Sequence, residues 1–311
     1  MECRHTTSPV PDLSAIIGRC EGAYSDITLR GYRNDLEVFK RWCKRRRADW
    51  LPATPEAVAR FVNEEALTKS LSTLKRRISA IQFLHRMADL PSPIGHSELH
   101  LAMRRAARAK RRRPHQALGL TAELLSDIVD ACPATLGGRR DAALFSVGYD
   151  TLCRSSELVA MRVEHLATDL TSIEVPRSKS DPFGDGRVAY LAPETGVRLR
   201  VWLAEADLNS GPLFRGLHTG RVSAVALDTS SVRRRIKAAA KRARLSTEVV
   251  SGLSGHSMRV GAAQDMMLAG FDTLGIMQAG GWRTHSVLSR YVENAAAARM
   301  HVRRWDSIAN R

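Results

Sequence analysis

The chain has 311 residues, and its 48 Lys and Arg against 32 Asp and Glu give a formal net charge of +16. Hydrophobic residues form 44% of the chain and charged residues 26%, a globular composition that excludes a disordered polycation. Apolar stretches are interrupted before about 18 residues, which excludes a transmembrane helix, and the first twenty residues hold no apolar block of a signal peptide.

The first third of the chain is predicted to be helical, because no strand pattern occurs before residue 117. Apolar residues recur there every three or four positions, and the helices are expected to begin near Thr28, Thr54, Leu71 and Ser97. Thr54 followed by Pro55 is a typical helix start, with a capping hydroxyl and a proline in the first turn. We expect a flexible tail over residues 1–20, a helical core domain over 21–107 and a basic linker over 108–117.

Residues 118–311 are predicted to form a second, larger domain, mainly α with a small antiparallel β-sheet. Alternating residues at 171–177 and 187–191 predict two strands, and the turn-rich loop SKSDPFGDG between them predicts a hairpin. An Ala-rich segment over 295–308 predicts a final helix with one apolar face. The other helices are expected over 121–131, 139–149, 196–206, 232–243, 258–269, 274–278 and 287–291.

The positive charge is concentrated in the first domain. Residues 1–117 hold 23 Lys and Arg against 12 Asp and Glu, and residues 118–311 hold 25 against 20, so the net charges are +11 and +5. Such a surface attracts polyanions, and nucleic acid is the commonest polyanion in a cell. Residues 21–107 are therefore expected to bind DNA. The basic residues expected to contact it are Lys44, Arg45, Arg46, Lys75, Arg76, Arg77, Arg111, Arg112 and Arg113.

Other interpretations of this composition remain open. A cationic surface without a binding function also fits the charge. A membrane surface fits less well, because no aromatic anchors follow the basic runs. The five cysteines are scattered and include no CxxC pair, which disfavours disulfides and zinc sites and predicts a protein of the reducing cytoplasm.

Six residues of the second domain carry groups suited to chemistry at a phosphate: Arg154, Lys179, His256, Arg259, Trp282 and Tyr291. Each alone also fits a structural role. His256 and Arg259 lie three residues apart and can pair on one helix face, and Trp282 after two glycines can anchor a core.

Together these residues favour cleavage of a phosphodiester without a metal. The pentavalent phosphorane carries extra negative charge, which two guanidiniums and an indole N–H or imidazole can stabilise. A phenol becomes a nucleophile when cations lower its pKa and a neighbour accepts its proton, and a lysine ammonium can protonate the leaving oxygen. The sequence holds no Mg²⁺ carboxylate cluster, P-loop, GxGxxG or HExxH motif, so we expect no metal and no cofactor.

The segment GHSMRVGAAQDMMLAGFDTLGIMQAGGWRTHSVLSRYVEN, residues 255–294, strongly resembles the tyrosine site-specific recombinases, or phage integrase family. The family's residues occur in the expected order. These are Arg154 in LCRSSEL, Lys179 in RSKS, the HxxR pair His256 and Arg259, Trp282 and Tyr291. Trp282 lies 26 residues after His256, and Tyr291 lies nine residues after Trp282, as expected for this family. Most members have a second histidine where this chain has Trp282, and Cre-like members have tryptophan.

The resemblance implies that three residues take part directly in bond cleavage and proton transfer. Tyr291 would attack the scissile phosphate, which leaves a 3′-phosphotyrosine and a free 5′-hydroxyl. His256 would assist as a base or hydrogen-bond partner, and Lys179 would protonate the departing 5′ oxygen. Since the covalent link conserves the phosphodiester energy, a partner strand could be religated without ATP, and two rounds of exchange would pass through a Holliday junction.

Four further residues would hold and organise the phosphate. Arg154 and Arg259 would clamp it, Trp282 would donate its indole N–H to it, and Glu157 would orient the site. The resemblance also implies a two-domain C-shaped clamp on double-stranded DNA, a dimer on each inverted-repeat site and a homotetramer at the synapse. Residues 295–308 would be the helix exchanged between protomers, and packing on their own domain is the alternative. Neither the target sequence nor any accessory protein follows from the resemblance.

Two other functions fit the same residues. A type IB topoisomerase or a hairpin-forming resolvase uses the same chemistry once, without joining two sites. A DNA-binding protein without activity, such as an excision accessory factor or an inactivated integrase acting as a repressor, needs only the basic surface. The full set of six polar residues argues against this second alternative.

Overall fold

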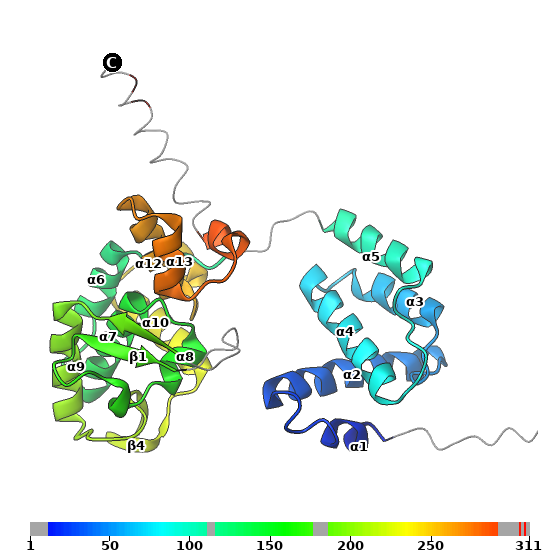
Figure 1. Cartoon of the computed structure of the whole chain (residues 1–311), viewed down its shortest axis with the longest axis horizontal. Coiled ribbons are helices and arrows are strands. Elements are labelled where there is room, and N and C mark those ends of the chain that lie inside the picture. Colours follow the sequence, from blue (N-terminus) through cyan, green and yellow to red (C-terminus); the bar gives the residue numbers. More distant parts are fainter. Residues whose placement is uncertain (1–11, 111–115, 177–185, 292–304, 306–307, 309–311) are drawn as a thin grey trace, which may run out of the picture. The chain divides into compact units, whose positions relative to one another are not determined.

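Figure 1 shows the chain in a computed structural model, which describes residues 12–110, 116–176, 186–291, 305 and 308. The chain divides into two compact units, Met1–Pro114 and His115–Arg311, and this division falls within the predicted linker over 108–117. The described elements are mainly helices with two short antiparallel hairpins. Among the described residues, no helix is long and apolar enough to cross a membrane.

The described part of the first unit consists of helices around one apolar core. They are α1 (Leu13–Gly18), α2 (Asp26–Arg46), α3 (Pro55–Glu65), α4 (Leu71–Met87) and α5 (Ser97–Ala109). Helix α2 packs on α4, and α3 packs on α5. Leu36, Phe39, Phe61 and Leu84 are fully buried between them. As predicted, Thr54 caps α3, since its Oγ1 accepts a hydrogen bond from the Ala57 amide at 3.2 Å.

The prediction of a flexible tail over residues 1–20 is wrong for its second half. Asp12 caps α1 by accepting a hydrogen bond from the Ser14 amide, and Leu13, Ile16 and Ile17 are buried in the core of the first unit. Three large apolar side chains supply enough buried surface to hold a six-residue helix. Residues 1–11 lie outside the described residues.

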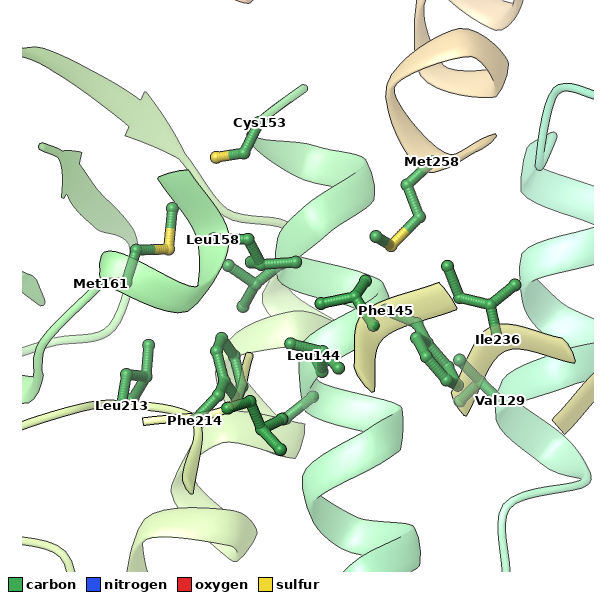
Figure 2. Packing of buried hydrophobic residues seen from close by; sticks show 14 of the residues in the cluster. Val129, Leu144, Phe145, Cys153, Leu158, Met161, Leu213, Phe214, Ile236 and Met258 are labelled. Carbon is green, nitrogen blue, oxygen red and sulfur yellow. The ribbon is translucent and has the colours of Figure 1, made fainter. Parts of the chain in front are cut away.

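The second unit is centred on the long helix α7 (Leu136–Asp150). Four helices pack against it: α6 (Ala122–Asp130), α8 (Ser155–Ala160), α9 (Pro193–Glu205) and α12 (Ser257–Leu268). Figure 2 shows Leu144 and Phe145 of α7 among Leu158, Ile236 and Met258 of surrounding helices, and all five are fully buried. The other described helical elements are η1 (Val163–His165), α10 (Thr229–Arg242), α11 (Thr247–Gly252) and α13 (Thr273–Gly280). Residues 285–291 are also helical.

Two hairpins lie in the described part of this unit, of which the sequence predicts one. Strands β1 (Ser172–Val175) and β2 (Arg187–Tyr190) pair antiparallel, as predicted. The loop that joins them, residues 177–185 with Lys179, lies outside the described residues. Strands β3 (Arg215–His218) and β4 (Arg221–Ala226) were not predicted. The residues of their two-residue turn, Thr219 and Gly220, have φ of +48° and +79°, which is typical of a type I′ hairpin turn.

A carboxylate in α12 ties that helix to its neighbours. Asp265 Oδ2 accepts hydrogen bonds from the Tyr149 hydroxyl at 2.5 Å and from the Ala122 amide at 2.7 Å. At the other end of α12, the Leu120 amide donates to the Ser257 carbonyl at 2.8 Å. These bonds fix α12 relative to the end of α7 and to the segment 120–122. Of the predicted helix over 295–308, only Trp305 and Ile308 lie within the described residues, so its exchange between protomers stays a prediction.

Candidate active site

The turn that follows α7 places Arg154. Leu152 in this turn has a left-handed φ of +49°, and Arg154 is the N-cap residue of α8. Glu157, which is 5% exposed, accepts hydrogen bonds from the Arg154 amide at 2.9 Å and from its Nη1 at 2.6 Å. One buried carboxylate therefore holds both the main chain and the guanidinium of Arg154.

The start of α12 lies beside the start of α8. Ser155 Oγ donates a hydrogen bond to the Gly255 carbonyl at 2.8 Å, although 100 residues separate the two in sequence. A Cβ at Gly255 would collide with Ser155 Oγ, so the glycine permits this approach. As a result, His256 and Arg154 line one cavity of about 430 Å³ together with several hydroxyl groups.

Among the described cations of the site, Arg259 is the most buried, at 1% exposure. Its Nη1 donates to the Leu152 carbonyl, and its guanidinium carbon lies 4.0 Å from the ring centroid of Trp282. Its Nε and Nη2 are buried and have no hydrogen-bond partner among the described residues. Burial, together with repulsion from Arg154, lowers the pKa of Arg259 to about 10, so its side chain remains charged at neutral pH.

The Trp282 ring packs against the Arg259 guanidinium, and the Tyr291 ring lies beside that of Trp282. Gly281, with φ of +66°, ends α13 in the left-handed conformation and turns the chain into Trp282. The indole is 6% exposed, and its N–H has no partner within the described ranges. The ring centroid of Tyr291, on the helical segment 285–291, lies 5.6 Å from that of Trp282.

The imidazole of His256 also lies near the ring of Tyr291, with ring centroids 6.4 Å apart and planes nearly perpendicular. Partial burial lowers the pKa of His256, and the positive charges of Arg259 and Arg154 lower it further. The imidazole is therefore neutral at neutral pH and can accept a proton.

The structure brings together six of the seven predicted catalytic residues: Arg154, Glu157, His256, Arg259, Trp282 and Tyr291. The seventh, Lys179, lies outside the described residues. Where the structure describes the chain, no group of three or more His, Cys, Asp or Glu side chains is placed to bind a metal ion.

Sequence reasoning missed one cation, Arg187. This residue begins β2, and its Nη2 donates a hydrogen bond to the Thr151 carbonyl. With Arg154, Glu157 and Trp282, it lines a second cavity of about 320 Å³. Arg187 is the first strand residue after the hairpin loop, and only this position next to Lys179's loop could have singled it out.

Among the described basic residues expected to contact DNA, some are simply exposed and others form ion pairs. Lys44, Arg45 and Lys75 are exposed. Arg46 is also exposed, but its Nη2 lies 2.9 Å from Glu64. Their contact with DNA stays a prediction, as does that of Arg111, Arg112 and Arg113, which lie outside the described residues.

Arg77 does not lie on the polar face of α4, and the structure corrects its assignment to DNA. Its side chain is buried, forms an ion pair with Glu65 and lies 3.7 Å from Asp35. Arg76 reaches the same aspartate through two hydrogen bonds of 2.6 and 2.8 Å, although 60% of its side chain is exposed. Ionic contacts with Asp35 of α2 and Glu65 of α3 therefore hold the Arg77 side chain in the interior of the first unit.

Comparison with known families gives matches over both units. Residues 119–298 match the family model described as "Phage integrase family", and residues 19–89 match "Phage integrase, N-terminal SAM-like domain". An integrase/recombinase XerD homolog of Selenomonas ruminantium is 29% identical over 290 residues, which cover 88% of this chain and 84% of the relative. Recombinase Cre of Escherichia phage P1 is 27% identical over 296 residues, which cover 88% and 85%.

Solved structures share the fold at lower sequence identity. The XerH site-specific recombinase bound to a palindromic difH substrate aligns with a TM-score of 0.66 and 15% identity, covering 96% of this chain and 85% of that one. Residues 75–356 of lambda integrase bound to DNA align with a TM-score of 0.63 and 17% identity, covering 93% and 98%.

Proposed function

Because this chain belongs to the phage integrase family of tyrosine recombinases, we propose that it cleaves and rejoins DNA at specific sites through a phosphotyrosine at Tyr291. The main support is a set of buried N–H donors without partners in the described part of the chain, two on Arg259 and one on Trp282. Buried donors are normally paired, and a phosphate oxygen would satisfy them. Tyr291 carries its hydroxyl on a ring that lies beside Trp282.

The first step is attack by the Tyr291 phenol on the scissile phosphorus. The phenolic oxygen forms a bond to phosphorus, the bond to the 5′ oxygen breaks, and the product is a 3′-phosphotyrosine. His256 accepts the phenolic proton, because its lowered pKa keeps it neutral, and Lys179 gives a proton to the departing 5′ oxygen. The reverse reaction with the 5′-hydroxyl of a partner strand reseals the DNA without ATP or a metal ion.

The negative charge of the phosphorane is held by fixed donors. Arg154 and Arg259 supply guanidinium N–H groups, Trp282 supplies its indole N–H, and Glu157 keeps Arg154 oriented. Contacts within the protein hold both guanidiniums, Arg154 on Glu157 and Arg259 on the Leu152 carbonyl, so the proposed reaction needs little reorganisation of these side chains.

Recombination between two duplexes requires assembly on DNA. We propose a dimer on each inverted-repeat site, with the two units of each protomer clamping the duplex, and a homotetramer that passes through a Holliday junction. Two relatives of the same fold support this proposal, XerH bound to a palindromic substrate and a lambda integrase tetramer bound to a Holliday junction. Exchange of the segment 295–308 between protomers belongs to the same proposal.

The proposal is tested with nicked duplexes made from an inverted repeat in the DNA that flanks the gene. Cleavage next to the nick releases a short fragment that carries the free 5′-hydroxyl. Once this fragment diffuses away, religation cannot occur and the covalent protein–DNA adduct is trapped. We expect an adduct resistant to denaturation, formed in the presence of EDTA and without ATP. Tyr291→Phe should bind the duplex normally and form no adduct, and an adduct with this variant would remove Tyr291 from its role.

A four-way junction separates the candidate functions. A recombinase resolves the junction into duplexes, whereas a topoisomerase-like relative forms the adduct and relaxes supercoils but leaves the junction intact. A DNA-binding protein without activity forms neither product.

Lys179 is tested as the general acid by changing the leaving group. Lys179→Ala should cleave an ordinary phosphodiester slowly and recover on a duplex with sulfur in place of the 5′ bridging oxygen, because a thiolate leaves without protonation. Absence of recovery would assign the proton to another residue.

A further inference from the structure

Arg187 contacts two segments of the site at once. Its Nη2 donates to the carbonyl of Thr151, a fully buried residue in the turn that leads to Arg154. On its other side, a Cβ placed on Gly281 would lie 3.4 Å from Arg187 Nε, so this side chain packs directly against the turn before Trp282.

Arg259 makes a matching bridge from α12. It donates to the Leu152 carbonyl, which follows that of Thr151, and it stacks on Trp282. Two arginines from different elements therefore bind successive carbonyls of one turn, and both touch the segment 281–282. Leu152 has a left-handed φ of +49°, a conformation that persists in a branched residue only where its surroundings hold it.

We infer that Arg187 is a positioning residue for DNA cleavage, which holds the turn 151–154 and thereby keeps the Arg154 guanidinium at the wall of the cavity beside Trp282. The inference rests on the proposed function. A methionine would fill a similar volume without a positive charge, but it would leave the buried Thr151 carbonyl without its donor. Burial lowers the pKa of Arg187, while Glu157 and Cys153 favour its charged form.

The test compares Arg187→Met and Arg187→Lys with Arg198→Met as a matched control. Arg198 is also a half-buried arginine of the second unit, and it donates to Ser146 Oγ at 3.1 Å. On the nicked duplex, Arg187→Met should slow adduct formation on the order of 10- to 100-fold, because displacement of a catalytic group by about 1 Å can have this effect. Its affinity for DNA should not change. Arg187→Lys should recover part of the rate, since an ammonium can still donate to the Thr151 carbonyl.

A double-mutant cycle separates positioning from general stability. In an Arg154→Lys background, Arg187→Met should have little further effect on the rate, because Arg187 acts through Arg154. Equal slowing in both backgrounds would overturn the inference. An equal loss of DNA affinity and cleavage rate would also overturn it, because Arg187 would then be a simple DNA contact.

Hydrogen exchange of the DNA-free protein gives a readout that is independent of the reaction. Peptides spanning residues 151–158 should exchange faster in Arg187→Met than in the wild-type protein or in Arg198→Met. Unchanged exchange would show that Arg187 does not hold the turn. A wild-type protein that forms no adduct would contradict the proposed function, and the exchange experiment would still decide whether Arg187 holds this turn.

Discussion

At the scale of single residues, the candidate site is centred on the contact between Arg259 and Trp282. The guanidinium carbon lies 4.0 Å from the indole ring centroid, yet neither side chain uses all of its N–H groups within the described residues. Each buried donor without a partner costs about 1–3 kcal/mol. A phosphate that pairs with these donors therefore gains affinity and transition-state stabilisation together.

Replacing Trp282 with phenylalanine tests the indole N–H. The phenyl ring keeps the contact with Arg259, so we expect the fold to be retained and adduct formation to slow on the order of 100-fold, the effect of removing one donor to developing charge. Single-turnover adduct formation measures the rate. Trp202→Phe is the control, because the indole of Trp202 donates to the Leu213 carbonyl at 2.9 Å in the core of the same unit. A wild-type rate for Trp282→Phe would exclude the indole as a donor.

The lowered pKa of His256 predicts the pH dependence of cleavage. As the pH falls through 6.5, the ordinary pKa of an imidazole, the cleavage rate should stay high. It should fall only at lower pH, when His256 becomes protonated. The unfolded chain binds this proton more tightly than the folded chain, so protonation also lowers the free energy of unfolding as the pH falls. The low-pH inflection should be missing from the pH–rate profile of His256→Gln. A wild-type inflection above 6.5 would contradict the assignment.

At the scale of elements, an ion cluster joins α2 to α4 and α3. Asp35 of α2 is 3% exposed and binds Arg76 and Arg77 of α4, and Arg77 also pairs with Glu65 of α3. The charges of this cluster are largely satisfied within the first unit. Its arginines therefore hold the helices together and contribute less to a DNA-binding surface than their sequence positions indicate.

Removing the central carboxylate should destabilise the first unit. Asp35→Ala leaves Arg77 buried with one partner fewer, and we expect the free energy of unfolding to fall by about 3 kcal/mol, as for other broken buried pairs. Denaturant unfolding followed by tryptophan fluorescence gives this value. Arg46→Ala, which breaks an exposed pair with Glu64, should lower it by less than about 1 kcal/mol. Equal effects of the two substitutions would mean that burial of the cluster contributes nothing.

Local signals in the sequence predicted some elements and not others. The Thr54–Pro55 start of α3 and the alternating residues of β1 and β2 act over a few positions, and both predictions are confirmed. Helix α1 and the β3–β4 hairpin are too short for a clear period and depend on packing against distant residues. The family resemblance, through the order and spacing of His256, Trp282 and Tyr291, predicted the candidate site. Arg187 contacts Thr151 and Gly281, which no local pattern connects to it.

At the scale of the whole molecule, the net charge of +16 predicts DNA binding that weakens steeply with salt. Exposed and buried arginines should differ in this respect. Arg45→Gln should reduce the slope of the logarithm of the binding constant against the logarithm of the salt concentration by about one. Arg77→Gln should leave that slope unchanged and lower stability instead, because Arg77 is buried. Fluorescence anisotropy over a series of salt concentrations measures both slopes, and a reversed pattern would place Arg77 at the DNA.

The central claim is that Tyr291 becomes esterified to DNA, and mass spectrometry of the trapped adduct tests it most directly. The adduct is formed on the nicked duplex in EDTA, digested with nuclease and trypsin, and its peptides are sequenced. The account predicts a nucleotide joined through phosphate to Tyr291 in the tryptic peptide of residues 291–299. A nucleotide on another residue, or an adduct that forms only with a divalent ion, would contradict it.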